Sequence, residues 1–171
     1  MIWTLRASEA SDFAAVWAMI QQAKRRMAAM GIDQWQDGDP DEGAILEAVS
    51  GDEGVIVVAP NRKIAGFAVV AFGIEESYEN LTSGQWKSDD EYATLHRVVV
   101  SENFIGRGVA GRLFDGAIER AKSENVASLR VDTHRDNTPM RRAIERKGFE
   151  YCGTCLLLTG EERVVYEKDK L

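Results

Sequence analysis

Residues 95–113 read LHRVVVSENFIGRGVAGRL. A run of β-branched apolar residues leads into a polar turn rich in glycine, and an amphipathic pattern begins directly after the turn. The pattern predicts a strand over 93–100, a tight turn, and a helix that opens near Gly108 and ends near Ser123.

The turn has the composition of an anion-binding site. Glycine allows positive φ and leaves no Cβ to keep a ligand away from the backbone, so several N–H groups can converge on one anion. The start of a helix adds unpaired amide donors and a partial positive charge, and Arg107 and Arg112 add full charges. The stretch predicts a phosphate or pyrophosphate ligand; the alternative is a tight strand-to-helix connection that binds nothing.

Two nucleotide-binding patterns can be compared with these residues. The Walker A pattern requires a Lys and then Ser or Thr after its second glycine, whereas Gly111 precedes Arg112. The Rossmann pattern G-x-G-x-x-G matches Gly106, Gly108 and Gly111, with Asp132 near the distance expected for its acidic residue. However, that pattern belongs in an early βαβ unit, and this stretch comes late, after several predicted strands.

Two segments resemble a known family. The segment VVVSENFIGRGVAGRLF resembles the acetyl-CoA-binding motif of the GNAT superfamily of N-acetyltransferases, Q/R-x-x-G-x-G/A after a strand. Gly108 and Ala110 occupy the small positions, and Ile105 replaces the usual Gln or Arg. A second segment, NTPMRRAIERKGF at 137–149, resembles the helix that follows in that family and its closing Gly-Phe. The resemblance covers nearly the whole chain.

Length and composition predict a globular protein. The chain has 171 residues, 44% hydrophobic and 29% charged, which fits one domain over 1–171 with a full core. The first residues show no signal-peptide pattern, and the apolar runs are too short to cross a bilayer, so we expect a cytoplasmic protein and no membrane partner.

The charge is unevenly distributed. The net charge of −7 disfavours nucleic-acid binding. Residues 97–148 contain 11 Lys or Arg and 7 Asp or Glu, a net +4, which leaves −11 for the remainder. This division suits a polyanionic cofactor and a cationic second substrate.

The remaining pattern predicts an α+β fold. The expected architecture is a mixed, mostly antiparallel central sheet of about seven strands flanked by about four helices, the three-layer arrangement of the GNAT fold. Ser8 is expected to cap the first helix, Asp41 the second and Asn137 the last. The strands are expected at 2–6, 54–59, 63–72, 93–100, 128–133, 151–158 and 163–167. The helices are expected after Ser8 up to Gly31, after Asp41 through Val49, from about Gly108 to near Ser123, and at about 138–147.

The C-x-x-C formed by Cys152 and Cys155 lies in a predicted strand without further cysteines. Redox pairs usually begin a helix and zinc sites need more ligands, so we interpret both as structural thiols and expect no metal.

The resemblance implies that acetyl-CoA is the co-substrate and that its acetyl group moves to an amine. It implies that the backbone of the strand end contacts pantetheine, that the glycine turn holds the pyrophosphate, and that Asn137 contacts the pantetheine arm. Asn137 would otherwise only cap its helix. The cofactor-binding residues implied are Val98, Val99, Val100, Ile105, Gly106, Arg107, Gly108, Val109, Ala110, Gly111, Arg112 and Asn137.

Transfer to an amine requires proton movements. A lysine-like amine has a pKa near 10.4, so its neutral form needs a base, and His96 and His134 are the only side chains that titrate near neutrality without perturbation. The leaving thiolate needs a proton, and the family's usual Tyr position is Ile144 here. The proton would then come from solvent or from another residue such as Tyr151.

Three aromatic residues lie in polar connections. Trp35 in 32–43, and Tyr78 and Trp86 in 75–92, are expected to shape the acceptor site, while Trp35 fits equally well as a loop anchor tucked into the core. The acceptor would be a small amine, a peptide N-terminus or a lysine.

Two other classes of function remain open. One is a non-catalytic acyl-CoA-binding sensor, and the other is a nucleotide-binding regulator. The sequence is compatible with a monomer or a homodimer.

Overall fold

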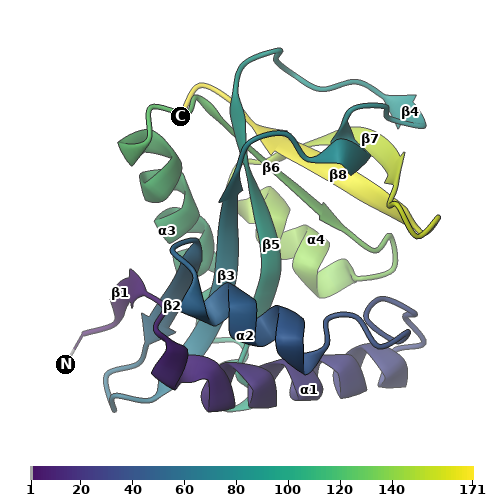
Figure 1. Ribbon diagram of the computed structural model, residues 1–171. Coiled ribbons are helices and arrows are strands. Elements are labelled where there is room, and N and C mark those ends of the chain that lie inside the picture. The colour runs from purple at the N-terminus through teal and green to yellow at the C-terminus, as the bar shows by residue number, and fades with distance from the viewer. Residues whose placement is uncertain (1) are drawn as a thin grey trace. The chain divides into compact units, whose positions relative to one another are not determined.

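The structure is a computed structural model that describes residues 2–171. Its eight strands are ordered β1-β2-β3-β5-β6-β8-β7-β4 by hydrogen bonding (Figure 1). The pair β5–β6 is parallel, and the pairs β1–β2, β2–β3, β4–β7, β6–β8 and β7–β8 are antiparallel. The predicted fold class, a mixed and mostly antiparallel sheet with four α-helices, is confirmed.

The elements follow the expected order with one addition. The very short strand β4 pairs with β7 inside the connection 75–92, where no strand was expected. The helices are α1 (Phe13–Ala29), α2 (Glu42–Ser50), α3 (Val109–Ser123) and α4 (Thr138–Arg146), with 3₁₀ turns η1 (Ala10–Asp12), η2 (Glu76–Tyr78) and η3 (Glu102–Phe104). The strands are β1 (Thr4–Ala7), β2 (Gly54–Val58), β3 (Ile64–Phe72), β4 (Ser83–Gly84), β5 (Tyr92–Val100), β6 (Ser128–Thr133), β7 (Glu150–Leu156) and β8 (Glu162–Lys168).

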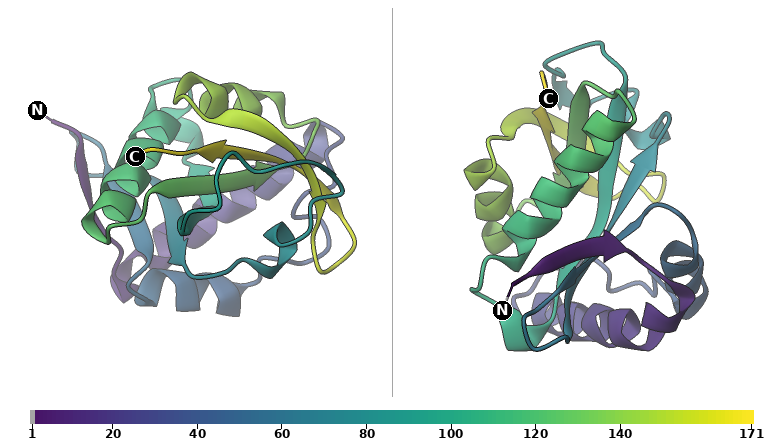
Figure 2. Two further views of the ribbon diagram at one scale, coloured as in Figure 1. Left: turned by 90° about the horizontal axis from the view of Figure 1, so that it is seen from above. Right: turned by 90° about the vertical axis from the view of Figure 1, so that its left-hand side faces the viewer.

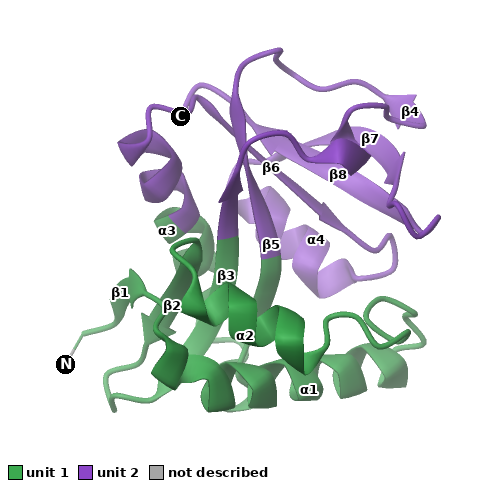
Figure 3. Ribbon diagram, in the orientation of Figure 1, with its two compact units in different colours: residues 1–69, 97–116 green, residues 70–96, 117–171 purple. Residues whose placement is uncertain are grey.

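The chain divides into two compact units (Figure 3). The first unit comprises Met1–Val69 and Arg97–Gly116, and the second comprises Val70–His96 and Ala117–Leu171. The strands β3 and β5 and the helix α3 contribute residues to both. The organisation of 1–171 as a single domain stays a prediction.

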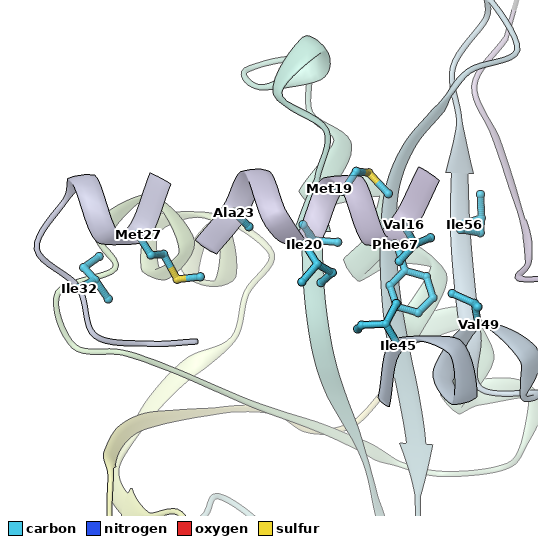
Figure 4. Close-up of a cluster of buried hydrophobic side chains, with 11 residues drawn as sticks. Val16, Met19, Ile20, Ala23, Met27, Ile32, Ile45, Val49, Ile56 and Phe67 are labelled. Atoms are coloured by element: carbon cyan, nitrogen blue, oxygen red, sulfur yellow. The ribbon is translucent and has the colours of Figure 1, made fainter. Parts of the chain in front are cut away.

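The core of the first unit lies between its helices and one face of its strands. The apolar stripe of α1 recurs at helical spacing, and α2 packs beside α1 (Figure 4). Burial of these side chains is the main source of stability in this unit. The cluster contains Val16, Met19, Ile20, Ala23, Met27, Ile32, Ile45, Val49, Ile56, Phe67 and Val99.

The strands of this unit are covered on both faces. Phe67 belongs to the α1/α2 cluster, while its neighbour Gly66 faces α3. A Cβ on Gly66 would stand 2.6 Å from Cγ1 of Val109 and 3.2 Å from Cδ1 of Leu113, so only glycine lets α3 approach this closely. Alternation along the strand therefore places helices on opposite faces, which is the predicted layered arrangement.

The start of α1 differs from the prediction. Ser8 does not cap the helix, because its buried hydroxyl donates to the carbonyl of Val49 at 2.9 Å. A capping box instead lies one turn earlier, around η1: Glu9 precedes η1, Asp12 is its last residue, and the Glu9 amide donates to Oδ2 of Asp12 at 2.8 Å. The expectation for Asp41 is correct, since its Oδ1 accepts from the amide of Ala44 at 2.8 Å.

In the second unit, the predicted hairpin of β7 and β8 forms with a register shift between Tyr151 and Gly153. Helix α4 packs on β8, and the contact is made through Tyr166 on β8. The ribbon of the whole chain is shown from two further sides in Figure 2. The hydroxyl of Tyr166 accepts from Nε of Arg141 at 2.8 Å and donates to Glu145 at 3.2 Å. These bonds fix the helix against the strand.

A buried carboxylate fastens the connection that precedes β5. Glu167 on β8 is fully buried, and its oxygens accept from the amide of Lys87, the hydroxyl and amide of Ser88, and the hydroxyl of Ser128. Its charge is balanced by Arg130, whose Nε lies 3.1 Å from Oε1. The chain around Ser88 is therefore held by charge-assisted hydrogen bonds.

Arg130 also has an aromatic environment. Its guanidinium lies 4.1 Å from the ring centroid of Trp86 and 4.0 Å from that of Tyr92. Cation–π contacts of this kind are strengthened where water is excluded, and Arg130 is buried.

Cys152 and Cys155 are free, buried thiols on β7. Burial, and next the charge of Asp132, raise the pKa of Cys155 to about 12. A thiol with this pKa stays protonated near neutrality, as expected of a structural cysteine. Among residues 2–171, no helix has both the length and the apolar character needed to span a bilayer.

Candidate functional site

The turn after β5 belongs to the first unit and is firmly anchored. The amide of Ser101 donates to the carbonyl of Ala65 at 2.8 Å, and the amide of Phe104 donates to Ser101 at 2.9 Å. Phe104 is buried and contacts the ring of Trp3 edge to face, with centroids 5.9 Å apart. These contacts fix the position of the backbone from which the glycine-rich residues 105–108 continue.

Two glycines of this turn adopt a positive φ, a conformation that glycine adopts most readily. Gly106 has φ +79° and Gly108 has φ +75°, and a Cβ built on either would meet nothing within 4 Å. Both residues are exposed, so the space over their backbone is open. Gly111, two residues into α3, is half-buried.

Helix α3 begins directly after Gly108, whose carbonyl accepts from the amide of Arg112 at 3.2 Å. The amides of residues 108–111 therefore have no partner within the helix. Val109 is buried beneath the turn, Ala110 is half-buried, and Ile105 is exposed with an extended backbone. The arrangement combines open glycines, free amide donors and a helix N-terminus, which are the elements of an anion site.

The arginines of the turn lie against aromatic rings. The guanidinium of Arg107 is 5.8 Å from the ring centroid of Phe104, and that of Arg112 is 4.9 Å from the ring centroid of Trp3. Nε of Arg112 is buried and has no hydrogen-bond partner among residues 2–171. The ring contacts hold both charges near the turn.

Two residues of α1 support this region and were not predicted from the sequence. Oε1 of Gln22 accepts from the amide of Glu102 at 3.0 Å, and Nη2 of Arg26 lies 3.4 Å from the carbonyl oxygen of Val100. Burial lowers the pKa of Arg26, while the charge of Glu102 raises it. The i, i+4 spacing of Gln22 and Arg26 was the available signal, since it places both on one helix face.

The end of β5 alternates between the core and a more open face. Val99 belongs to the α1/α2 cluster, while Val98 and Val100 are half-buried. Arg97 has φ +56°, which is unusual for a residue other than glycine within a strand, and its Nη1 lies 3.1 Å from Oδ2 of Asp39. The contact ties β5 to the connection between α1 and α2.

Trp35 lies in that same connection, has φ +63°, and is half-buried. Its ring packs against the hydrophobic cluster of the first unit. The connection is further held by Lys24, whose Nζ donates to the carbonyl of Pro40 at 2.7 Å. Of the two interpretations of Trp35, this packing supports the loop anchor.

His96 belongs to the second unit and pairs with Glu75, which follows β3. Its Nε2 lies 3.5 Å from Oε2 of Glu75, and both side chains are 30% exposed. His96, opposed by burial and aided by the amide of Ser77, lowers the pKa of Glu75. Sequence reasoning missed Glu75, because its proximity to His96 depends on how β3 and β5 meet the intervening connection.

Tyr78 and Trp86 are packed into the second unit. Tyr78 is 1% exposed, and its hydroxyl donates to Oδ2 of Asp132 at 2.6 Å. Nε1 of Trp86 donates to the carbonyl of Tyr78 at 2.9 Å. Burial, followed by the charge of Asp132, raises the pKa of Tyr78 well above its ordinary value. Its phenol therefore remains neutral.

The remaining candidates lie at the end of β6 and around α4. Nδ1 of His134 accepts from the amide of Asp136 at 3.1 Å. Oδ1 of Asn137 accepts from the amide of Met140 at 3.3 Å, so the predicted cap is present. Ile144 is fully buried, and the side chain of Tyr151 is exposed, with its ring edge to face with that of Tyr166.

The described residues contain no group of three or more His, Cys, Asp or Glu side chains arranged to hold a metal ion.

Comparison with known proteins now identifies the family. The model of the acetyltransferase (GNAT) family matches residues 14–149 of the chain. This chain belongs to the GNAT acetyltransferase family. A comparison with curated protein sequences gave no match.

Solved structures agree with this assignment. The chain is similar to a GNAT-family acetyltransferase from Streptococcus agalactiae, with 31% identity, a TM-score of 0.89, and coverage of 99% of this chain and 96% of that one. It shares the fold of a GNAT-family acetyltransferase from Listeria monocytogenes (20% identity, TM-score 0.73, coverage 98% and 94%). It also shares the fold of the ribosomal-protein-S18-alanine N-acetyltransferase from Escherichia coli (15% identity, TM-score 0.65, coverage of 99% of this chain and 94% of that one). A GNAT member is a transferase of acyl groups, and the family generally uses acetyl-CoA.

Proposed function

We propose that the chain is an acetyl-CoA-dependent N-acetyltransferase whose acceptor is a primary amine of a small molecule or a peptide. The observation that carries the proposal is the open glycine turn at the start of α3 in a member of the GNAT family. The net charge of −7 speaks against nucleic acid as the acceptor.

The turn fits the pyrophosphate of acetyl-CoA. An anion can approach the backbone of Gly106 and Gly108 because no Cβ stands in the open space above them. The unpaired amides of residues 108–111 point out of the helix N-terminus, where the dipole favours negative charge. Arg107 and Arg112 add positive charge nearby. The backbone at Val98–Val100 and the side chain of Asn137 would hold the pantetheine arm.

The amine must lose a proton before it attacks the thioester carbon. Making a lysine-like amine neutral at pH 7 costs roughly 4 to 5 kcal/mol. His96 and His134 are the proposed proton acceptors, directly or through water. When bound, acetyl-CoA supplies an activated acetyl group: the new C–N bond forms, the C–S bond breaks, and the thiolate takes up a proton.

The source of that last proton is not the usual one. Ile144 occupies the family's Tyr position and is buried, so it can donate nothing. We assign the proton to Tyr151 or to solvent, since Tyr151 is exposed. Positioning and polarisation of the thioester carbonyl by backbone donors supply much of the rate without a dedicated acid.

The role of the three aromatic residues Trp35, Tyr78 and Trp86 is to support the two polar connections expected to shape the acceptor site. Because Tyr78 is buried and Trp86 donates to its carbonyl, we propose that they support the connection before β5 and do not touch the amine. Trp35 would act in the same way for the connection between α1 and α2, against which it packs.

Substitution of Gly108 tests the cofactor site. Asp tolerates positive φ, so Gly108→Asp should fold, and its charge should oppose the pyrophosphate. We expect at least about a tenfold loss of CoA affinity by titration calorimetry. Gly160→Asp is the matched control, because Gly160 also has a positive φ, +89°, and a Cβ built on it would likewise meet nothing within 4 Å. Equal CoA affinity in Gly108→Asp and the unmodified protein would refute the cofactor assignment.

A second function, a non-catalytic acyl-CoA sensor, is favoured by one observation, the apolar Ile144 at the usual acid position. Free thiol release from acetyl-CoA across a panel of amines separates the two. Turnover with an amine supports the transferase, whereas tight CoA binding without turnover supports the sensor. Stronger thermal stabilisation by ATP or NAD than by CoA would instead indicate a nucleotide-binding regulator.

A further inference from the structure

Glu75 is held in place on several sides. Its backbone amide donates to the hydroxyl of Tyr92 at 2.9 Å, and its Oε1 accepts from the amide of Ser77 at 3.3 Å. Its other oxygen, Oε2, lies 3.5 Å from Nε2 of His96. The carboxylate therefore faces one particular nitrogen of the imidazole.

This orientation determines which nitrogen carries the proton. A carboxylate beside Nε2 favours the tautomer with its hydrogen on Nε2, and the lone pair then resides on Nδ1. The structure gives Nδ1 of His96 no hydrogen-bond donor among residues 2–171. In His134 the arrangement is different, because Nδ1 already accepts from the amide of Asp136.

We propose that Glu75 is the positioning residue for His96: it holds the imidazole with the proton on Nε2 and directs Nδ1 to accept the proton of the amine. The inference rests on the proposed acetyltransferase function. The step balances, because the amine proton passes to Nδ1 as the C–N bond forms, and the carboxylate stabilises the resulting imidazolium without taking the proton itself.

The surrounding charges are compatible with this role. The titratable groups near Glu75 include Tyr92, whose hydroxyl accepts from the Glu75 amide, and Tyr78 and Cys155, whose pKa values are raised, chiefly by burial, so that both are neutral near pH 7. Asp132 is bonded to the Tyr78 hydroxyl. Asp132 is offset by Arg163, whose Nε lies 3.9 Å from Oδ1. The pKa of Glu75 is lowered, chiefly by its contact with His96, so its carboxylate is ionised near neutrality.

The connection after β3 is rigid enough to fix the pair. Glu75 caps η2, and Tyr78 at the end of η2 is bonded to Asp132 on β6. Trp86 donates to the carbonyl of Tyr78. A positioned carboxylate acts on a base only when its own geometry is fixed, and these contacts provide that geometry.

Imidazole nitrogen spectra test the proposal directly. The chain has two histidines, so ¹⁵N correlation spectra contain two imidazoles, and His134→Gln assigns the remaining signals to His96. At alkaline pH we expect His96 as the tautomer protonated on Nε2. Glu75→Gln keeps the acceptor for Ser77 but loses the charge, so we expect a mixture of tautomers. Glu75→Asp keeps the charge but is too short to reach Nε2, and it should give the same mixture.

Kinetics provide the second measurement. In Glu75→Gln we expect kcat/KM for the amine to fall at least about tenfold, with CoA affinity unchanged, because the glycine turn is untouched. Glu76→Gln removes an exposed charge one residue away and is the matched control.

The outcomes separate this inference from the proposed function. If the unmodified protein turns over normally, either of two results would overturn the inference and leave the acetyltransferase function standing. One is a His96 tautomer protonated on Nδ1, and the other is full activity in both Glu75→Gln and His96→Gln. CoA binding without turnover in the unmodified protein would overturn both.

Discussion

Tyr78 and Asp132, 54 positions apart in the sequence, are joined by a hydrogen bond of 2.6 Å between the phenol and Oδ2. The bond links the connection before β5 to the end of β6. Tyr78, which the sequence places as an aromatic residue in a polar connection, is therefore buried within the second unit and bonded to β6.

Removing the Tyr78 hydroxyl should destabilise the protein. In Tyr78→Phe the carboxylate of Asp132 loses a charge-assisted hydrogen bond, and we expect a loss of about 1.5–3 kcal/mol in the free energy of unfolding, measured with urea. Tyr151→Phe is the control for stability, because its ring is exposed and the change should stay within about 0.5 kcal/mol. Equal losses in both variants would contradict this account.

The buried ion pair of Glu167 and Arg130 should be sensitive to removal of one partner. Glu167→Ala leaves the guanidinium of Arg130 buried without its counter-ion, so we expect a loss of about 3–5 kcal/mol by denaturant unfolding. Glu150→Gln removes the exposed partner of Lys87 and should cost less than about 1 kcal/mol. A small effect of Glu167→Ala would show that water reaches the pair.

Much of the fold was predictable because local chemistry decides it. The turn before α3, the strand expected at 63–72 and the caps by Asp41 and Asn137 each depend on neighbouring residues, and the structure confirms these elements. Ser8 was assigned wrongly as a cap, because its bond to the carbonyl of Val49 joins residues 41 positions apart. Local reasoning also missed β4, whose two residues pair with β7.

The candidate site was less predictable than the fold. Glu75 looked like one acid among several in a polar connection, and its relationship to His96 arises only when the chain folds. The same holds for Gln22 and Arg26, which act on the start of the glycine turn from a helix about 80 residues earlier. Long-range pairs of this kind have no local sequence signature.

Asp12 should determine part of the stability in acid. Both of its oxygens accept from Arg6 at 2.8 Å, and this bond, opposed by burial, lowers the pKa of Asp12 below 3.8. Its stabilising contribution is therefore complete above pH 3.8 and is lost as pH falls through the lowered pKa. Asp12→Asn should lower the free energy of unfolding by about 1.5–3 kcal/mol at pH 7 and flatten its decline below pH 3.8.

The control for this acid-limb measurement is Asp89→Asn, since Asp89 is exposed. It should leave both the stability at pH 7 and the slope below pH 3.8 as in the unmodified protein. A curve for Asp12→Asn that runs parallel to the unmodified one throughout the acid range would be inconsistent with the lowered pKa.

Cys155 should contribute to the loss of stability in alkali. Its folded pKa is raised from 9 to about 12, chiefly by burial, so its stabilising contribution is present below pH 9 and declines as pH rises toward 12. Cys155→Ala should therefore show a shallower decline between pH 9 and 12, measured by urea unfolding at each pH. Cys152→Ala should show a smaller change of slope; unchanged slope in Cys155→Ala would show that the thiol ionises without unfolding.

Asn137 can be tested for its two roles separately. Its Oδ1 caps α4 through the amide of Met140, and the proposed function gives its amide a contact with pantetheine. Asn137→Ala should lose about 0.5–2 kcal/mol of stability, whereas Asn137→Ser retains a capping oxygen and should lose little. If the side chain also binds the cofactor, both variants should weaken CoA affinity to a similar degree, because neither carries an amide. Normal CoA affinity in Asn137→Ser would restrict Asn137 to the cap, since the helix start would then be intact and only the amide missing.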